Sequence, residues 1–202
     1  MVQKMSNSTS HDNLTYQNIL LETEALILEK GCRKTTLKDI IDRTGLSKGA
    51  IYHYVASKDE LFGLILKIKI EQVNEKFNQI ISQPSKKDPA AGRFGMATQF
   101  FHTRQNPNDV GNLIFIYLLS QDDEKVKSIL KSVYHYSKAT GVQWIEMGQQ
   151  NGVIPPHIDA EKMASLFMTF SYGLRVTQIL SSSEEEQVAT SDIFRLLIRT
   201  LS

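Results

Sequence analysis

The sequence predicts an all-α protein, and three observations favour this fold class. Apolar residues recur at helical spacing through nearly all of the chain, no run alternates strictly between apolar and polar residues, and no Asn-Gly or Asp-Gly hairpin turn lies between apolar stretches. Of the 202 residues 41% are hydrophobic and 22% are charged, a balance that excludes a disordered or collagen-like chain. We therefore expect about nine helices around a buried core.

The first expected helix spans residues 13–30. Within it Leu21, Ala25 and Leu28 stand at i, i+4 and i+7 and mark an apolar face. Gly31 follows, and glycine is the usual residue for the left-handed cap that ends a helix. Residues 1–12 are polar, so we expect a flexible N-terminal arm there.

Two short helices come next and are joined by a glycine turn. Thr35 or Thr36 caps the second helix, which ends at Gly45, and Ser47 caps a third helix over residues 48–55. The residues expected to point inward from the second helix are Leu37, Ile40 and Ile41. Helix, tight turn and helix form the helix-turn-helix unit, whose second helix has the right diameter for the major groove of DNA.

The remainder of the chain also has helical periodicity. Ser57 caps a long fourth helix over residues 58–81, and a loop with proline, lysine and glycine follows at residues 83–92. Five further helices are expected at 89–103, 109–121, 122–150, 159–181 and 184–201. The last two are apolar enough to form a dimer interface, although ordinary core packing accounts for the same pattern.

Charge is distributed unevenly along the chain. From Lys30 to Lys58 seven basic residues stand against two acidic ones, whereas the net charge of the whole chain is only +1. A short basic segment in an otherwise acidic chain is typical of a protein that binds phosphates through that segment alone. The alternative interpretation is a solvated charged face. We expect three parts: the arm (1–12), a helix-turn-helix domain (13–57) and a larger helical domain (58–202).

The segment from Thr35-Thr36 through Leu61 resembles the TetR family of transcriptional regulators, and with the helix that Gly31 closes the resemblance covers roughly 45 residues. The resemblance implies that residues 13–57 bind DNA and that residues 58–202 form a ligand-binding and dimerisation domain. The motifs that carry it are Gly31, Thr35-Thr36, Gly45-Leu46-Ser47, Gly49-Ala50-Ile51-Tyr52-His53-Tyr54 and Ser57-Lys58-Asp59-Glu60-Leu61. The later helices agree with the family's ligand and dimer domain in number and order only.

The resemblance, together with helix physics, implies a set of DNA contacts. They are Thr35, Thr36, Ser47, Lys48, Gly49, Ala50, Tyr52, His53, Tyr54 and Lys58. Base reading is expected from Lys48, Gly49 and Ala50, and the rings of residues 52–54 are expected to grip phosphates. A cation at the start of a helix opposes the helix dipole, so a phosphate partner would explain Lys58. The alternatives are that Lys48 touches only phosphate and that Gly49 merely relieves crowding in the turn.

Aromatic residues beyond the loop are candidates for an effector pocket. They are Phe100, His102, Phe115, Tyr117, Tyr134, Trp144, Met147 and Phe170, all of which could equally be core residues. The acidic run at residues 122–124 begins a helix, where carboxylates complement the dipole, so we expect no metal site there. We expect no cofactor either, because no glycine-rich nucleotide loop is present.

The resemblance implies a ligand-responsive transcriptional regulator, most simply a repressor. It would bind a palindromic DNA operator as a homodimer through its last two helices and be released by a small-molecule effector. The alternative is a helical protein that binds or sequesters a small molecule without reading DNA, and an enzyme is disfavoured because no catalytic motif is found. The single cysteine, Cys32, the absence of a signal sequence and a longest apolar run of seven residues favour a cytoplasmic protein that crosses no membrane.

Overall fold

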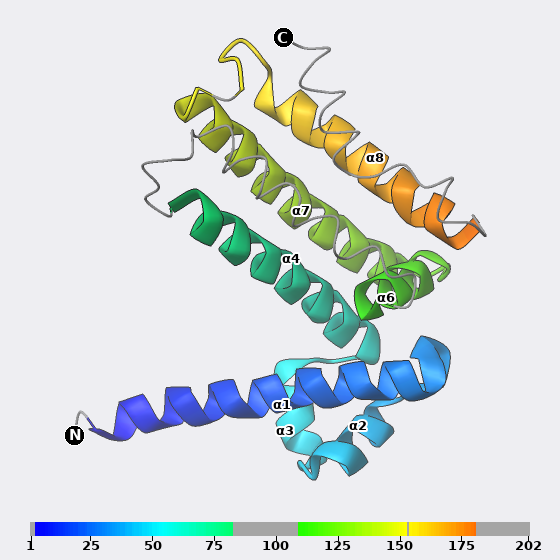
Figure 1. Cartoon of the computed structure of the whole chain (residues 1–202). Coiled ribbons are helices and arrows are strands. Elements are labelled where there is room, and N and C mark those ends of the chain that lie inside the picture. The colour runs from blue at the N-terminus through cyan, green and yellow to red at the C-terminus, as the bar shows by residue number, and fades with distance from the viewer. Residues whose placement is uncertain (1–2, 83–108, 153, 181–202) are drawn as a thin grey trace. The chain divides into compact units, whose positions relative to one another are not determined.

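The computed structural model describes residues 3–82, 109–152 and 154–180, and every regular element in these ranges is a helix (Figure 1). The helices are α1 (Gln3–Lys34), α2 (Leu37–Thr44), α3 (Lys48–Tyr54), α4 (Lys58–Ser82), α6 (Val110–Leu119), α7 (Glu124–Gln150) and α8 (Ala160–Leu180). The all-α prediction is confirmed. The described ranges hold seven helices rather than about nine, and the helices expected at 89–103 and 184–201 lie outside them. None of the described helices has the length and apolar content that a membrane span needs.

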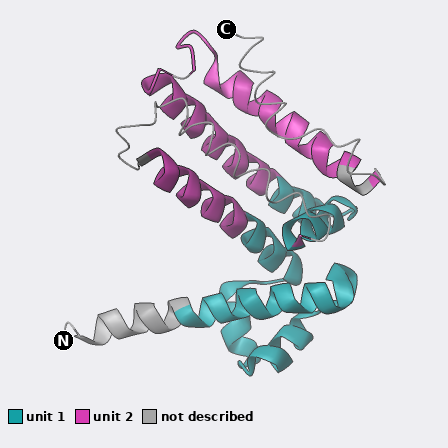
Figure 2. Ribbon diagram, viewed as in Figure 1, with its two compact units in different colours: residues 1–66, 110–130 teal, residues 67–109, 131–202 magenta. Residues whose placement is uncertain are grey.

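The chain divides into two compact units, which Figure 2 shows in different colours. Unit 1 comprises residues 1–66 and 110–130, and unit 2 comprises residues 67–109 and 131–202. Unit 1 therefore contains more than the three N-terminal helices, because the start of α4, all of α6 and the start of α7 are packed with them.

Helix α1 is longer than the sequence indicates, and its buried face is different from the one expected. It begins at Gln3, since no glycine or proline interrupts the chain before Gly31, where φ reaches 79° and the helix kinks. The fully buried residues of α1 are Ile19, Thr23 and Ile27. Leu21 and Leu28, which mark the apolar face in the sequence, are instead exposed to solvent.

The short helices α2 and α3 begin and end at the expected residues. Thr36 caps α2 in a capping box: its hydroxyl oxygen accepts from the Asp39 N–H at 3.2 Å, and the Asp39 carboxylate accepts from the Thr36 N–H at 2.8 Å. Gly45 ends α2 in the left-handed conformation with φ 69°. Ser47 then caps α3, its side-chain oxygen accepting from the Ala50 N–H at 3.2 Å.

Each unit has its own core. In unit 1 the fully buried side chains come from all of its helices except α7, and they include Ile40, Ile51, Phe62, Ile114 and Leu118. Helix α1 contacts both α2 and α6. The three N-terminal helices and α6 thus share one hydrophobic core.

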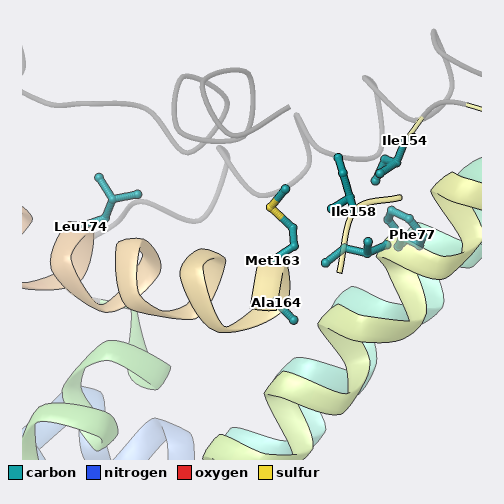
Figure 3. Packing of buried hydrophobic residues seen from close by; sticks show 7 residues of the cluster. Phe77, Ile154, Ile158, Met163, Ala164 and Leu174 are labelled. Atoms are coloured by element: carbon teal, nitrogen blue, oxygen red, sulfur yellow. The ribbon is translucent and has the colours of Figure 1, made fainter. Parts of the chain in front are cut away.

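In unit 2 the core lies where α7 meets the start of α8 and the turn before it (Figure 3). Phe77 of α4 stacks on Trp144 of α7 with ring centroids 4.8 Å apart, and the indole N–H of Trp144 donates to Asn74 Oδ1 at 2.9 Å. The buried members of this cluster are Phe77, Ile145, Ile154, Ile158, Met163, Ala164 and Leu174. Trp144 and Met147, both expected at an effector pocket, pack against it.

Candidate nucleic-acid interface

The exposed face of α3 carries the residues that the sequence predicts at DNA bases. Lys48 and Gly49 in its first turn and Tyr52 one turn later are exposed, and the Lys48 ammonium lies 5.5 Å from the centre of the Tyr52 ring. This distance is within the range of a cation–π contact. The contact places a positive charge and a phenol side by side on one face, a combination that suits phosphate and base edges.

The opposite face of α3 holds it against α1. The Tyr54 ring lies 5.4 Å from the ring of Tyr16 and 5.3 Å from that of His53. Burial raises the pKa of Tyr16, which agrees with a position in the packing between the helices. Tyr54 therefore braces α3, whereas Tyr52 and His53 remain exposed.

Gly49 is not required by the fold of the described residues. Its φ is not positive, and a Cβ atom built on it would meet only the Ser47 Oγ atom, at 3.9 Å, which is ordinary contact. The crowding explanation for this glycine therefore does not apply. The absence of a side chain leaves the backbone of the first turn of α3 open to a close neighbour from outside the chain.

The two threonines before α2 differ in their surroundings. Thr36 is exposed, and its hydroxyl also donates to Asp39 Oδ2 at 2.6 Å. Thr35 is completely buried, and its hydroxyl donates to the carbonyl oxygen of Gly31 at 3.0 Å. Thr35 has no surface to offer a phosphate in this arrangement, so its role here is to hold the end of α1.

Lys58 has a set of partners that the sequence did not indicate. Its ammonium donates to the carbonyl oxygens of Cys32 at 3.1 Å and Thr35 at 3.0 Å, with a longer bond of 3.4 Å to Arg33. These are carbonyls at the C-terminal end of α1, where a cation is favoured by the helix dipole. A phosphate is thus not needed to explain this cation, because a second helix end within unit 1 stabilises it.

Tyr117 of α6 completes the surroundings of Lys58. The Lys58 ammonium lies 5.0 Å from the centre of the Tyr117 ring, and that ring meets the edge of Phe62 at 5.6 Å. Burial, with the nearby carboxylate of Asp59, raises the pKa of Tyr117 to about 12. Tyr117, which was expected to line the effector pocket, therefore connects α6 to the start of α4 and, through Lys58, to the end of α1.

The other expected pocket residues are divided between the two units and the ranges that the structure does not describe. Phe115 lies in α6 of unit 1, Phe170 is exposed on α8, and Phe100 and His102 lie outside the described ranges. Tyr134 of α7 lies 6.4 Å from Tyr172 of α8, centroid to centroid.

Two residues near Tyr134 were missed by sequence reasoning. Burial raises the pKa of Tyr172. Arg175 stands one turn further along α8, and burial lowers its pKa, while the charges of Tyr172 and Asp109 act in the opposite direction. An arginine within the apolar run of α8 is the signal that could have indicated a polar group inside unit 2. In the described part of the chain no three histidine, cysteine or carboxylate side chains are grouped as a metal site would require.

Comparisons with known proteins agree with this geometry. Residues 19–65 match the family model described as bacterial regulatory proteins of the tetR family. The HTH-type transcriptional repressor ComR of Escherichia coli (strain K12) is 23% identical over 163 residues, which are 80% of this chain and 78% of ComR.

Solved structures show the same fold. A TetR transcription regulator from Haloarcula marismortui superposes with a TM-score of 0.68 at 19% identity, covering 94% of this chain and 98% of that one. The regulator FadR from Bacillus subtilis, solved in complex with stearoyl-CoA, superposes with a TM-score of 0.62 at 15% identity, and the superposition covers 92% of this chain and 97% of FadR. Residues 19–65 thus match the tetR family model, and most of the chain is similar in sequence to a transcriptional repressor and in fold to solved regulators of that family.

Proposed function

We propose that this DNA-binding regulator is a cytoplasmic, ligand-responsive repressor that binds a palindromic operator as a homodimer and is released by a small-molecule effector. The observation that carries the proposal is the exposed face of α3, where Lys48 lies over Tyr52 beside a glycine that the fold does not require. Such a face has no role in the core of unit 1, and it has the charge and shape that a DNA groove accepts.

The proposed DNA contacts follow from exposure and hydrogen bonding. Lys48, Gly49 and Ala50 read bases, and Tyr52 and His53 bind phosphates. The hydroxyls of Ser47 and Thr36 are exposed near the starts of α3 and α2 and add phosphate contacts. Tyr54, Thr35 and Lys58 hold these elements in place through contacts inside unit 1 rather than by touching DNA.

The proposed dimer uses α8 and the segment that follows it. Helix α8 exposes large apolar residues along its length: Leu166, Phe170, Val176 and Leu180. Burial of such a face against a second copy is favourable, and a two-fold axis would present two α3 helices to half-sites about 34–36 Å apart.

The proposed effector binds in the helical domain expected over residues 58–202. FadR, a structural neighbour, was solved with stearoyl-CoA, which supports a small molecule as the effector class. Since α6 shares the core of unit 1 and contacts Lys58 through Tyr117, a displacement of α6 would alter the position of α1 relative to α4. The effector must bind the released conformation more tightly than the DNA-bound one, and this difference limits the response.

A selection of DNA duplexes from a random pool, followed by fluorescence anisotropy at two salt concentrations, tests the proposal. The wild type should enrich a palindrome and bind it less tightly as salt rises. Tyr52→Ala should weaken binding, and Gly49→Ala should do so without lowering the melting temperature, because its methyl group fits the fold.

Lys48→Ala separates base contact from phosphate contact. Loss of a base contact weakens DNA binding by about 1–3 kcal/mol in free energy and relaxes the sequence preference at one position. Loss of a phosphate contact weakens binding to all duplexes equally and reduces the slope of log affinity against log salt concentration by about 1. Lys125→Ala, an exposed lysine on α7, is the matched control and should bind as the wild type does. A folded protein that enriches no sequence would overturn the proposal and favour a helical protein that sequesters a small molecule.

A further inference from the structure

Helix α8 carries one charged residue in its apolar part. From Met163 to the end of the helix at Leu180, Arg175 is the only residue with a charged side chain. Moving a guanidinium out of water costs free energy unless an anion or several hydrogen-bond acceptors compensate its charge. Neither the proposed DNA contacts nor the proposed dimer face uses this charge, so its role has to be sought within unit 2.

Arg175 lies on the side of α8 that is turned away from the proposed dimer face. Met168, Tyr172 and Arg175 follow one another at i, i+4 and i+7, a spacing that places them on one side of a helix. The same period places Phe170, which is exposed, roughly opposite this side. Met168 is buried, whereas Tyr172 and Arg175 are partly exposed and so remain accessible from solvent.

A second tyrosine joins this group from the neighbouring helix. The ring of Tyr134 on α7 lies 6.4 Å from that of Tyr172, and the two rings are tilted by 32°. Burial raises the pKa of Tyr172 and the positive charge of Arg175 acts against this rise, so the guanidinium lies within electrostatic reach of the phenol. Lys138, one turn from Tyr134 on α7, is paired with Glu161 at 2.6 Å. Arg175 is therefore the cation that acts on these two tyrosines together.

The charge of Arg175 is only partly compensated by the residues that the structure describes. Burial lowers the pKa of Arg175 by more than Tyr172 and Asp109 raise it. A guanidinium keeps its charge under physiological conditions, so a further negative group beside it is favourable. A bound anion is such a group.

We propose that Arg175, Tyr134 and Tyr172 bind the carboxylate of an organic acid with an apolar body, and that such acids are the effectors of the function proposed above. A planar guanidinium forms two parallel hydrogen bonds with a carboxylate, and phenol hydroxyls donate further ones. The tyrosine rings and Met168 offer apolar surface to the rest of the molecule. One arginine with Asp109 nearby suits a single negative charge, which favours a monocarboxylate over a phosphate ester with two charges.

Asp109 connects this site to α6 through the chain. It directly precedes Val110, the first residue of α6, and its charge acts on Arg175. A bound carboxylate neutralises the guanidinium and repels Asp109. Binding of the acid therefore weakens an interaction of the residue that leads into α6. The effector role rests on the function proposed above, whereas the binding site itself does not.

Titration calorimetry of the whole chain without DNA tests the site. The probes are octanoate, decanoate, phenylacetate and naphthoate, and each is compared with its primary amide, which has nearly the same shape and no charge. At least one acid should bind about tenfold more tightly than its amide, because a hydrogen bond between charged partners is stronger than a neutral one. Equal affinities for acids and amides, or binding of no acid in the series, would overturn the site.

Two substitutions separate the shape of the guanidinium from its charge. Arg175→Lys should keep part of the preference for acids, and Arg175→Met should lose it. Lys162→Met, at an exposed cation near the start of α8, is the matched control and should keep the wild-type preference. A folded Arg175→Met protein that still prefers acids would exclude Arg175 as the carboxylate ligand.

Asp109→Asn tests the site without changing the arginine. It should tighten acid binding several-fold, because a carboxylate that repels the ligand is removed. If Arg175 served only as a structural partner of Asp109, this substitution would bring no gain in affinity. An unchanged or weaker affinity would therefore count against the site, even if the Arg175 variants failed to fold.

Release from DNA is measured separately by fluorescence anisotropy. The acid that binds most tightly should weaken operator binding of the wild type by about fivefold or more and leave that of Arg175→Met unchanged. An acid that binds the chain without weakening operator binding would overturn the effector role and leave the site intact. If the wild type bound no operator at all, the proposed function would fail, and calorimetry would still decide the site.

Discussion

Lys58 shows how one residue's role depends on atoms far away in the sequence. Its position in the first turn of α4 is unfavourable for a cation, and the sequence offered a phosphate as the compensating partner. The compensation is instead internal, because carbonyl oxygens of Cys32, Arg33 and Thr35 accept its three N–H groups. The residue thereby ties the end of α1 to the start of α4.

Replacement of Lys58 should therefore destabilise the protein even in the absence of DNA. Lys58→Met leaves the partly buried carbonyls of Cys32 and Thr35 without this donor, at a cost of about 1–3 kcal/mol in the free energy of unfolding. Urea denaturation monitored by circular dichroism measures this change. Lys38→Met, at an exposed position on α2, is the control, and equal stability of the two variants would contradict the internal role.

At the scale of elements, the start of α2 is stabilised by charge as well as by its capping box. Lys30 of α1 lies 2.7 Å from the Asp39 carboxylate. This ammonium, followed by the hydrogen bonds from Thr36, holds the pKa of Asp39 well below its usual range. A carboxyl whose pKa is lowered by folding stabilises the protein above its unfolded pKa of about 4, and this contribution is lost as the pH falls toward the folded value.

Asp39→Asn should accordingly act in a pH-dependent manner. Because the pair is partly exposed, we expect a loss of only about 1 kcal/mol at pH 7, shrinking as the pH is lowered below about 4. Thermal unfolding between pH 3 and pH 7, in about five steps, measures the difference. A difference for Asp39→Asn that stays constant over this pH range would exclude the ionic contribution.

The approach of α4 to α7 depends on a glycine. A Cβ atom at Gly63 would lie far inside contact distance of the Ile129 Cγ2 atom. Gly63→Ala would gain about 1 kcal/mol in helix propensity, but the stiff β-branched side chain must move, so we expect a net loss of about 1–3 kcal/mol.

A double variant tests the cause of that loss. Ile129→Ala should relieve the clash, so that adding Gly63→Ala to it costs less than adding Gly63→Ala to the wild type. Gly173→Ala on α8, where a Cβ meets nothing within 4 Å, is the control and should be neutral or stabilising in chemical denaturation. Additive effects in the cycle would show that Ile129 is not the obstacle.

At the scale of the whole molecule, the proposed function requires two copies. Phe170→Asp places a charge in the exposed apolar face of α8 and should convert the proposed dimer into a monomer, as measured by sedimentation velocity. Operator affinity should fall sharply, because each half-site then binds on its own instead of at the high effective concentration of a joined pair. Leu119→Asp, at an exposed position on α6, should leave the sedimentation coefficient unchanged, and an unchanged coefficient for Phe170→Asp would place the dimer elsewhere.

Local signals in the sequence were enough to predict the helix-turn-helix. The Thr36 and Ser47 caps and the Gly45 turn were predicted correctly because each depends on hydrogen bonds between residues three or four positions apart. The all-α class followed in the same way from periodicity. The family was recognised because its motifs are confined to this short segment.

Contacts between residues that are distant in the sequence were determined only by tertiary packing. The spacing of Leu21 and Leu28 identified an apolar face but not which face α1 buries, since that depends on where α2 and α6 lie. Lys58 acquired its partners from the end of α1 and from Tyr117 of α6, which are distant from it in the sequence. Helix caps and their hydrogen bonds join residues within one turn of helix, so they can be predicted directly from the sequence. Burial and charge compensation depend on residues that come into contact only when the chain has folded, so they are determined by the tertiary structure.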